Sequence, residues 1–238
     1  MKYGITPHIL EEIYLIYNIM LNAEEGNKII GNLIKSGKPF SIIRLRSETN
    51  CLDWYLTQNY PKTFPNFYEV NGGLYPLNRK VIEYYSKTIK EGIELCNYSG
   101  YWDMHSSQYE NYGKKVKKMA LLHNRSLEPF YFDNPWSQFL KNKKVLVIHP
   151  FTDTIKKQYL KKDLLWENKN VLPDFTIKTI KSTQSSGGSE LPHSNWMESL
   201  NFMLNQVKEV DFDVALLGCG CYDIPISTEI KKMGKQSI

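Results

Sequence analysis

Three predicted strands in the second half of the chain constrain the fold most, because a stretch with helical spacing follows each of them. The strand at residues 145–148 is continuously apolar, the one at 175–180 alternates as a half-buried strand, and the third lies at 212–217. Helices are predicted at 152–160, 195–207 and 225–232. Apolar strands that alternate with helices are typical of parallel βαβ units, in which helices cover both faces of the sheet. The sequence therefore predicts an α/β fold with a Rossmann-like, mostly parallel sheet flanked by helices.

The first half of the chain adds further elements. A strand is predicted at residues 39–46, a long amphipathic helix at 77–96, a short strand at 119–122, and a helix at 24–36 that ends at Gly37. Thr6 and Pro7 are typical of a helix start, as N-cap and first-turn residue. We therefore expect a helical N-terminal extension at 1–37 and a Rossmann-like domain at 38–238.

The last residues suggest that the domain continues. The helix at 226–232 ends at Met233-Gly234, which is a common helix C-terminus. Residues 235–238 then resemble the opening of another strand, and strands usually run about five or six residues. We expect the domain to extend past residue 238.

Composition excludes several function classes. Of 238 residues, 42% are hydrophobic and 23% charged, with 30 basic and 25 acidic side chains. These values are typical of a soluble globular protein, and no apolar run of 18 residues or signal peptide is found. The lysines are scattered among acids and no nucleic-acid-binding module is found, so no nucleic-acid partner is expected. The predicted location is the cytoplasm.

Cysteine usage indicates no disulfide scaffold and no zinc site. Cys51 and Cys96 are isolated, and Cys219 and Cys221 are separated by one residue. Zinc sites and redox pairs usually have two residues between cysteines. We interpret the four cysteines as small buried residues.

The loop after the first strand of the domain carries two arginines and a carboxylate. In open parallel sheets, ligands bind beyond the carboxyl ends of the strands. Arg44, Arg46 and Glu48 follow the strand at this position. A guanidinium suits phosphate, and a carboxylate suits a sugar hydroxyl or a metal. The alternative is an exposed Arg–Glu pair with no function.

Two later loops also follow the carboxyl ends of predicted strands. His149, Pro150 and Phe151 leave the strand at 145–148, and Thr152 can cap the following helix. After the strand at 212–217 comes Gly218-Cys219-Gly220-Cys221-Tyr222-Asp223. Glycines there allow close approach of backbone to a ligand, but the third glycine of the dinucleotide fingerprint is missing. The alternative interpretations are that His149 has only a structural role and that residues 218–223 form an ordinary loop.

Three other segments are weaker candidates. Asn71-Gly72-Gly73 has the composition of a turn. Residues 185–189 form a polar segment that is either a lid or an ordinary loop. Trp102-Asp103 either stacks on a sugar or base or is part of the core.

The ordered set of these segments resembles the GT-D class of glycosyltransferases from bacterial surface-polysaccharide loci. The resemblance covers roughly residues 38–238. The segments that carry it are 40–45, 71–76, 101–103, 127–131, 135–136, 143–151, 155–159, 172–173, 196–200 and 211–235. The His149-Pro150-Phe151 and Gly218-x-Gly220-x-Tyr222 blocks are the most specific in combination.

This resemblance implies transfer of a sugar from a nucleotide-sugar donor to a glycan acceptor. The diphosphate leaving group then needs cations or helix amides, and the acceptor hydroxyl needs a proton acceptor. On this basis Glu48, Asp223 and His149 are assigned catalytic roles. Donor binding is assigned to Arg44, Arg46, Asn71, Gly72, Pro150, Phe151, Gly218, Gly220 and Tyr222. Glu128 and Glu198 are secondary candidates.

The chain departs from the family pattern at the possible metal site. The family commonly shows Arg-x-Gly-Asp-Gly-Glu, whereas this chain has Arg44-Leu45-Arg46-Ser47-Glu48-Thr49. With one carboxylate left in this loop, no metal ligand is assigned, and Mn²⁺ or Mg²⁺ stays an open cofactor. We hypothesise that Arg46 supplies the cationic role directly, and strict metal dependence of transfer contradicts this idea.

The sequence thus predicts a nucleotide-sugar-dependent glycosyltransferase of surface-polysaccharide biosynthesis. A rival interpretation is a non-catalytic nucleotide-sugar-binding or interaction module on the same fold, favoured by the altered Arg-x-Gly-Asp segment. An NAD-dependent oxidoreductase is a third interpretation, and it depends only on the Gly218-x-Gly220 pattern.

Overall fold

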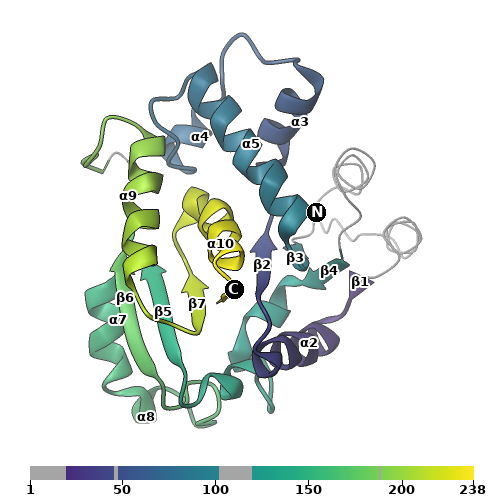
Figure 1. Ribbon diagram of the computed structural model, residues 1–238, viewed down its shortest axis with the longest axis vertical. Helices are drawn as coiled ribbons and strands as arrows, with labels where there is room; N and C mark the ends of the chain where they lie inside the picture. The colour runs from purple at the N-terminus through teal and green to yellow at the C-terminus, as the bar shows by residue number, and fades with distance from the viewer. Residues whose placement is uncertain (1–19, 46–47, 102–119, 188) are drawn as a thin grey trace, which may run out of the picture.

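One parallel sheet organises the molecule (Figure 1). The computed structural model describes residues 20–45, 48–101, 120–187 and 189–238. In these residues eight strands pair in the order β1-β4-β3-β2-β8-β7-β5-β6, and every pair is parallel. The strands are β1 (Met20–Leu21), β2 (Phe40–Arg44), β3 (Tyr98–Tyr101), β4 (Ala120–His123), β5 (Lys144–His149), β6 (Thr176–Lys181), β7 (Val214–Leu217) and β8 (Gln236–Ser237). The predicted α/β fold is confirmed.

Helices cover both faces of this sheet. They are α2 (Ala23–Ser36), α3 (Glu48–Thr57), α4 (Phe67–Val70), α5 (Arg79–Leu95), α7 (Thr152–Tyr159), α8 (Lys162–Leu165), α9 (Trp196–Glu209) and α10 (Asp223–Lys232). Short 3₁₀ turns lie at Asn124–Leu127, Pro129–Tyr131, Trp136–Leu140 and Gly220–Tyr222. The predicted helices at 24–36, 77–96, 152–160, 195–207 and 225–232 are therefore confirmed, with small differences at their ends.

Alternation along the strands divides the core into two clusters. Ile42 of β2 and Val145 of β5 pack with α2 on one face, whereas Ile43 and Leu146 pack with α3, α5, α9 and α10 on the other. Neighbouring strand residues point to opposite faces. Since both faces are covered, both members of each pair are buried, which explains the continuous apolar runs.

Helix α2 is defined at both ends by its own sequence. Asn22 and Glu25 form a reciprocal capping box at its start. Gly37 ends it with a φ of 67°, a left-handed conformation that glycine adopts without strain. Ile30 and Ile34 of α2, within the predicted extension at 1–37, are fully buried beside Phe40. Thr6 and Pro7 lie outside the described residues.

Strand β8 lies inside the sheet, between β2 and β7. Its neighbour Ile238 donates its N–H to the carbonyl of Ala215 at 3.0 Å and accepts from the N–H of Leu217 at 2.8 Å. The buried hydroxyls of Ser41 and Ser237 both contact that of Ser227, at 2.6 and 2.8 Å. Residues near 237 thus pair with residues near 41, and the strand predicted at 235–238 is confirmed.

Helix α3 was not predicted from the sequence. Its buried residues are Thr49, Cys51 and Leu52, so the inward face is partly polar and short. Such a face gives no clear helical repeat of apolar residues. The consequence for the site is that Glu48, placed in a turn by the sequence, is the first residue of a helix.

None of the helices in the described residues is both long and apolar enough to cross a lipid bilayer.

Candidate functional site

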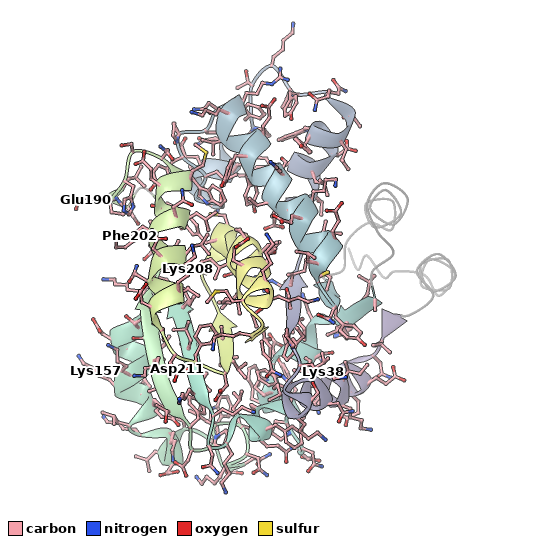
Figure 2. The ribbon with its side chains drawn as sticks, in the orientation of Figure 1. Lys38, Lys157, Glu190, Phe202, Lys208 and Asp211 are labelled. Atoms are coloured by element: carbon pink, nitrogen blue, oxygen red, sulfur yellow. The ribbon has the colours of Figure 1, made fainter. Side chains whose placement is uncertain are left out.

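The candidate site lies at the carboxyl ends of the central strands, at the upper edge of the sheet in Figure 1. Lys38 and Asp211, which precede β2 and β7, mark the opposite edge in Figure 2. Helix α10, after β7, packs in the cluster with α5 and α9. Helix α7, after β5, stacks Tyr159 on Phe175, which belongs to the α2-side cluster. Helices that leave neighbouring strands toward opposite faces open a crevice, and ligands bind there in this class of sheet.

Cavity 1 collects the charged candidates. It has a volume of about 380 Å³ and lies where β2, α3, α5 and the β7–α10 loop meet. Its lining residues are Arg44, Glu48, Phe67, Tyr68, Asn71, Gly72, Leu74, Tyr85, Gly220, Cys221, Asp223 and Ile224. Arg44 ends β2, while Glu48 and Asp223 begin α3 and α10. Carboxylates at helix starts interact favourably with the helix dipole, which helps to hold both acids at this edge.

The environment of Asp223 shifts the pKa of its carboxyl group. Burial raises its pKa above the ordinary value, because a charge is costly to desolvate. The backbone N–H of Cys219 donates to Oδ1 at 2.6 Å, and this bond and the positive charge of Arg44 both act to lower the pKa. The net direction is upward, which makes Asp223 a stronger base than an exposed aspartate.

Cavity 2, of about 210 Å³, adjoins cavity 1 and is chemically different. It is lined by Asn71, Gly72, Gly73, His149, Pro150, Phe151, Ser182, Thr183, Gln184, Ser185, Ser186, Gly218, Cys219, Gly220, Cys221 and Tyr222. No Asp, Glu, Lys or Arg is among these described residues. Phe151 offers an aromatic ring that is 57% exposed.

The orientation of His149 is set by its own loop. The backbone N–H of Phe151 donates to Nδ1 of His149 at 3.0 Å. An N–H can only donate, so the neutral imidazole carries its proton on Nε2. The ring also lies against Gly218, where an added Cβ would stand 2.6 Å from Cδ2 of His149. His149 therefore presents a hydrogen-bond donor rather than a base, and Gly218 provides the space for it.

Gly220 adopts a backbone conformation that favours glycine. Its φ of 64° is left-handed, and nothing lies within 4 Å of an added Cβ. The residue lines both cavities, so the backbone is open to a ligand at their boundary.

Tyr222 holds a neighbouring segment in place. Ser185 donates its hydroxyl to the carbonyl of Gly73 at 2.6 Å, so the Tyr222 hydroxyl, 2.9 Å away, donates to Ser185. The Tyr222 side chain is 1% exposed and its ring stacks on Trp196 at 5.4 Å. These contacts fasten Ser185, in the segment predicted as a lid or loop, to the turn at Gly73.

A third cavity of about 500 Å³ joins the first two. Apolar side chains of β2, β5, β7 and other segments form most of its lining, but Arg44, His149 and Asp223 also line it. Glu128, a secondary candidate, belongs to this cavity. Glu198 does not line any of the three and instead accepts from the N–H of Ser194 at 3.1 Å at the start of α9.

The structure brings the predicted site residues together. Each of those in the described part of the chain lines at least one of the three adjoining cavities: Arg44, Glu48, Asn71, Gly72, His149, Pro150, Phe151, Gly218, Gly220, Tyr222 and Asp223. Arg46, Trp102 and Asp103 lie outside the described residues. The interpretation of Cys51, Cys96, Cys219 and Cys221 as buried residues is confirmed.

Five polar side chains that line cavities 1 and 2 were not predicted: Tyr68, Tyr85, Ser182, Thr183 and Gln184. Tyr85 of α5 lines cavity 1, and burial, followed by the charges of Glu48 and Asp223, raises its pKa well above the ordinary value. Its phenol therefore stays protonated as a donor. The helical spacing of the apolar residues predicts that Tyr85 is buried in the core, but it gives no information on the position of the hydroxyl. Ser182 lines cavity 2 directly after β6. The strand-end rule, that ligands bind beyond the carboxyl ends of parallel strands, would have indicated Ser182 if it had been applied to the strand at 175–180.

Within the described residues, no group of three or more His, Cys, Asp or Glu side chains is placed to hold a metal. Glu48 and Asp223 both line cavity 1 and are two carboxylates. Mg²⁺ is commonly held by one or two carboxylates together with substrate phosphates. The pair therefore fits a cation bound jointly with a diphosphate, and not a cage made by the protein alone.

Comparison with known proteins supports the fold. The sequence matches no protein-family model and no curated protein sequence. The structure is similar to two solved structures of domain of unknown function 1792, one of them described as having "a distinct glycosyltransferase fold". Each has a TM-score of 0.58 and 10% sequence identity over 97% of this chain and 80% of the other. The chain therefore has a glycosyltransferase-like α/β fold.

Proposed function

We propose that this protein is a cytoplasmic glycosyltransferase of the GT-D type, which transfers a sugar from a nucleotide-sugar donor to a glycan acceptor in surface-polysaccharide biosynthesis. One observation carries the proposal. Arg44, Glu48 and Asp223, from three separate segments, line a single cavity at the carboxyl ends of the strands. A cation beside two carboxylates supplies what the transfer of a sugar from a diphosphate requires.

Arg44 is assigned to the leaving group. As the acceptor oxygen bonds to the anomeric carbon, the bond from that carbon to the phosphate oxygen breaks and the diphosphate keeps the electron pair. A guanidinium can bind two phosphate oxygens at once and stabilises the charge that develops there. The Nε2–H of His149, in the adjoining cavity, adds a second donor.

Asp223 is assigned as the proton acceptor for the acceptor hydroxyl. Its raised pKa brings its basicity closer to the working pH. Glu48 is then assigned to the hydroxyls of the transferred sugar. His149 is less suited to the role of base, because Nδ1 already accepts from Phe151.

If the reaction uses a divalent cation, Glu48 would hold it together with the diphosphate, because Asp223 is assigned as the proton acceptor. The cation would supply positive charge to the diphosphate when bound. Arg44 lines the same cavity and provides part of that charge from the chain itself.

The rival function is a binding module without turnover, and the altered Arg-x-Gly-Asp segment favours it. Glu48→Gln separates the two functions. If the protein is an enzyme that uses Glu48, transfer falls at least tenfold while donor binding persists. If Glu48→Gln leaves donor hydrolysis and transfer unchanged, Glu48 has no catalytic role.

The test of the proposal is thermal unfolding with UDP-, GDP- and dTDP-sugars at millimolar concentration. A donor that binds only the folded state raises the melting temperature, and the rise grows with the logarithm of the ratio of donor concentration to Kd. We expect one nucleotide class to protect the wild-type protein and to protect Arg44→Gln less. No shift with any donor contradicts the proposal.

A further inference from the structure

We infer that a fourth cavity, separate from the candidate site, is a carbohydrate-binding site that holds a neutral oligosaccharide against aromatic rings. This cavity 4 has a volume of about 400 Å³ and shares no lining residue with cavities 1 to 3. The inference depends on the proposed function in one respect only, which is that the oligosaccharide is the distal part of the acceptor.

Three aromatic side chains that line cavity 4 are in contact with one another. The ring of Phe130 stacks on that of Trp166, with centroids 5.3 Å apart and an angle of 8° between the planes, and lies 4.6 Å from the ring of Tyr131. Phe130, Tyr131 and Trp166 are 44, 54 and 39% exposed. Large apolar side chains that gather at a surface are typical of an interaction site. We call these three side chains the aromatic wall.

The aromatic wall is held by contacts between two segments that are distant in the sequence. The side-chain amide of Asn168 donates to the carbonyls of Asp133 at 2.9 Å and Phe132 at 3.4 Å. The guanidinium of Arg125 lies 5.1 Å from the centroid of the Tyr131 ring. These contacts position the rings before a ligand binds, which lowers the entropy cost of binding.

The polar groups of cavity 4 indicate the kind of ligand. Asp133 and Glu167 line it and are exposed, and no Lys or Arg is among its described lining residues. A carboxylate accepts hydrogen bonds from sugar hydroxyls and repels anions. The C–H groups on the face of a sugar ring pack on the electron-rich face of an aromatic ring. Aromatic faces beside carboxylates therefore suit a neutral sugar better than an acidic one.

The position of cavity 4 relates it to the acceptor. Pro129 lines cavity 3 together with Arg44 and Asp223, and the next residue, Phe130, lines cavity 4. Figure 1 shows α8, which precedes Trp166, at the lower end of the sheet, whereas the candidate site lies at the upper edge. Only an acceptor of several sugar residues spans this separation. Sugar residues that bind without reacting lower KM and leave kcat unchanged.

An anionic lipid surface is the competing occupant. Leu160, at the end of α7, and Leu164, in α8, are 87 and 84% exposed, and lysines lie beside them in the sequence. Apolar side chains among lysines suit an anionic membrane. Neither leucine lines cavity 4, however, and the carboxylates of Asp133 and Glu167 repel anionic headgroups. The contents of the cavity thus favour the oligosaccharide.

Calorimetric titration tests the site without any transfer reaction. The probes are maltohexaose, laminarihexaose and mannohexaose, the monosaccharides glucose and mannose, and the hexamer of galacturonic acid. We expect at least one neutral hexasaccharide to bind at millimolar concentration, more tightly than its monosaccharide and than the acidic hexamer. No binding of any neutral hexasaccharide at up to about 10 mM overturns the inference.

Substitutions in the aromatic wall locate the bound hexasaccharide. Trp166→Ala and Tyr131→Ala are each expected to lower its affinity about three- to tenfold, because one stacking surface is lost. Phe202→Ala is the matched control, since this aromatic side chain of α9, labelled in Figure 2, is 51% exposed and lines none of the four cavities. Melting temperatures check that each variant is folded. Affinity that both wall substitutions leave unchanged overturns the site.

Kinetics test the assignment to the acceptor, with the hexasaccharide that binds and its disaccharide as acceptors. Trp166→Ala should raise KM for the hexasaccharide about three- to tenfold and leave kcat and the donor KM unchanged. The disaccharide is too short to reach the aromatic wall, so its KM should not change. Equal effects on both acceptors, or no effect on either, overturn this assignment.

The outcomes separate the carbohydrate site from the proposed function. Hexasaccharide binding that depends on Trp166, in a protein that transfers no sugar, supports the site and contradicts the transferase. Sugar transfer by a protein whose glycan binding is independent of Trp166 overturns the site and leaves the transferase proposal standing. Binding to phosphatidylglycerol vesicles that Trp166→Ala abolishes, without hexasaccharide binding, assigns the surface to lipid and also overturns the inference.

Discussion

Asp223 combines a partly buried carboxylate with a nearby positive charge, and its substitution by Asn separates its charge from its shape. The Asn side chain keeps an oxygen that can accept from the N–H of Cys219. We expect Asp223→Asn to lower the transfer rate about 100- to 10,000-fold, the usual contribution of a general base, with donor affinity nearly unchanged. Steady-state kinetics and calorimetric donor titration measure the two quantities. A rate within threefold of wild type excludes Asp223 as the base.

The pKa of Asp223 also predicts a pH dependence of stability. A carboxyl whose pKa is higher in the folded than in the unfolded state binds more protons when folded. Its contribution to stability is therefore present below the unfolded pKa and is lost as pH rises through the folded pKa. At neutral pH, Asp223→Asn should unfold at higher denaturant concentration than wild type, and the difference should shrink under acid conditions. Denaturant titrations at several pH values measure this.

Arg44 acts on Asp223 through its charge, which is one of the influences that lower the pKa of the carboxyl. In Arg44→Gln this influence is absent, so the pKa of Asp223 moves further upward. The base must be ionised to accept a proton, and the acid limb of the rate profile should therefore move to higher pH. The measurement is kcat against pH at saturating donor. An acid limb that stays in place shows that Asp223 does not control it.

The strand-end rule predicted most of the site residues, because Arg44, His149 and Gly218 stand where apolar runs stop. This rule does not predict Tyr85, which lines cavity 1 from the middle of a helix. The buried and unpaired state of the Ser182 hydroxyl was also not predictable, since hydrogen bonding depends on neighbours far along the chain.

At the scale of elements, the β7–α10 loop and the β5–α7 loop fit together through Gly218 and His149. Alanine at position 218 places a Cβ 2.6 Å from the imidazole, a separation that requires the ring to move. Movement of the ring breaks its bond from the N–H of Phe151. We expect Gly218→Ala to lower donor affinity about tenfold, measured by calorimetric titration.

A double-mutant cycle shows whether this effect acts through His149. If it does, Gly218→Ala changes donor affinity less than twofold in the His149→Ala background, because the displaced ring is absent. Additive losses in the double variant indicate instead that the loop itself is disturbed.

At the scale of the whole molecule, the fold class was predictable and the order of the strands was not. Continuous apolar runs alternating with helices predict a covered parallel sheet, and this is observed. That β8 lies between β2 and β7 depends on contacts between residues about two hundred positions apart, such as Ser41 and Ser237. Local periodicity contains no information about such pairs.

The position of β8 has a consequence for the site. It separates β2, which carries Arg44, from β7, which leads to Asp223, so it sets the spacing of the two sides of cavity 1. Gln236 of β8 is 3% exposed, and its Nε2 donates to the carbonyls of Lys38 at 3.0 Å and Leu33 at 3.2 Å. These bonds connect the last strand to the end of α2 and the start of β2.

We therefore expect Gln236→Ala to lower the free energy of unfolding by about 1–3 kcal/mol, because buried hydrogen bonds are lost. Gln206→Ala is the control, since this half-buried side chain on α9 makes one hydrogen bond among the described residues, of 3.5 Å, and its loss should change stability by less than about 0.5 kcal/mol. Urea denaturation measures both variants. If Gln236→Ala is as stable as the control, β8 does not depend on these bonds. If it is destabilised and binds donor more weakly while folded, β8 also sets the spacing between Arg44 and Asp223.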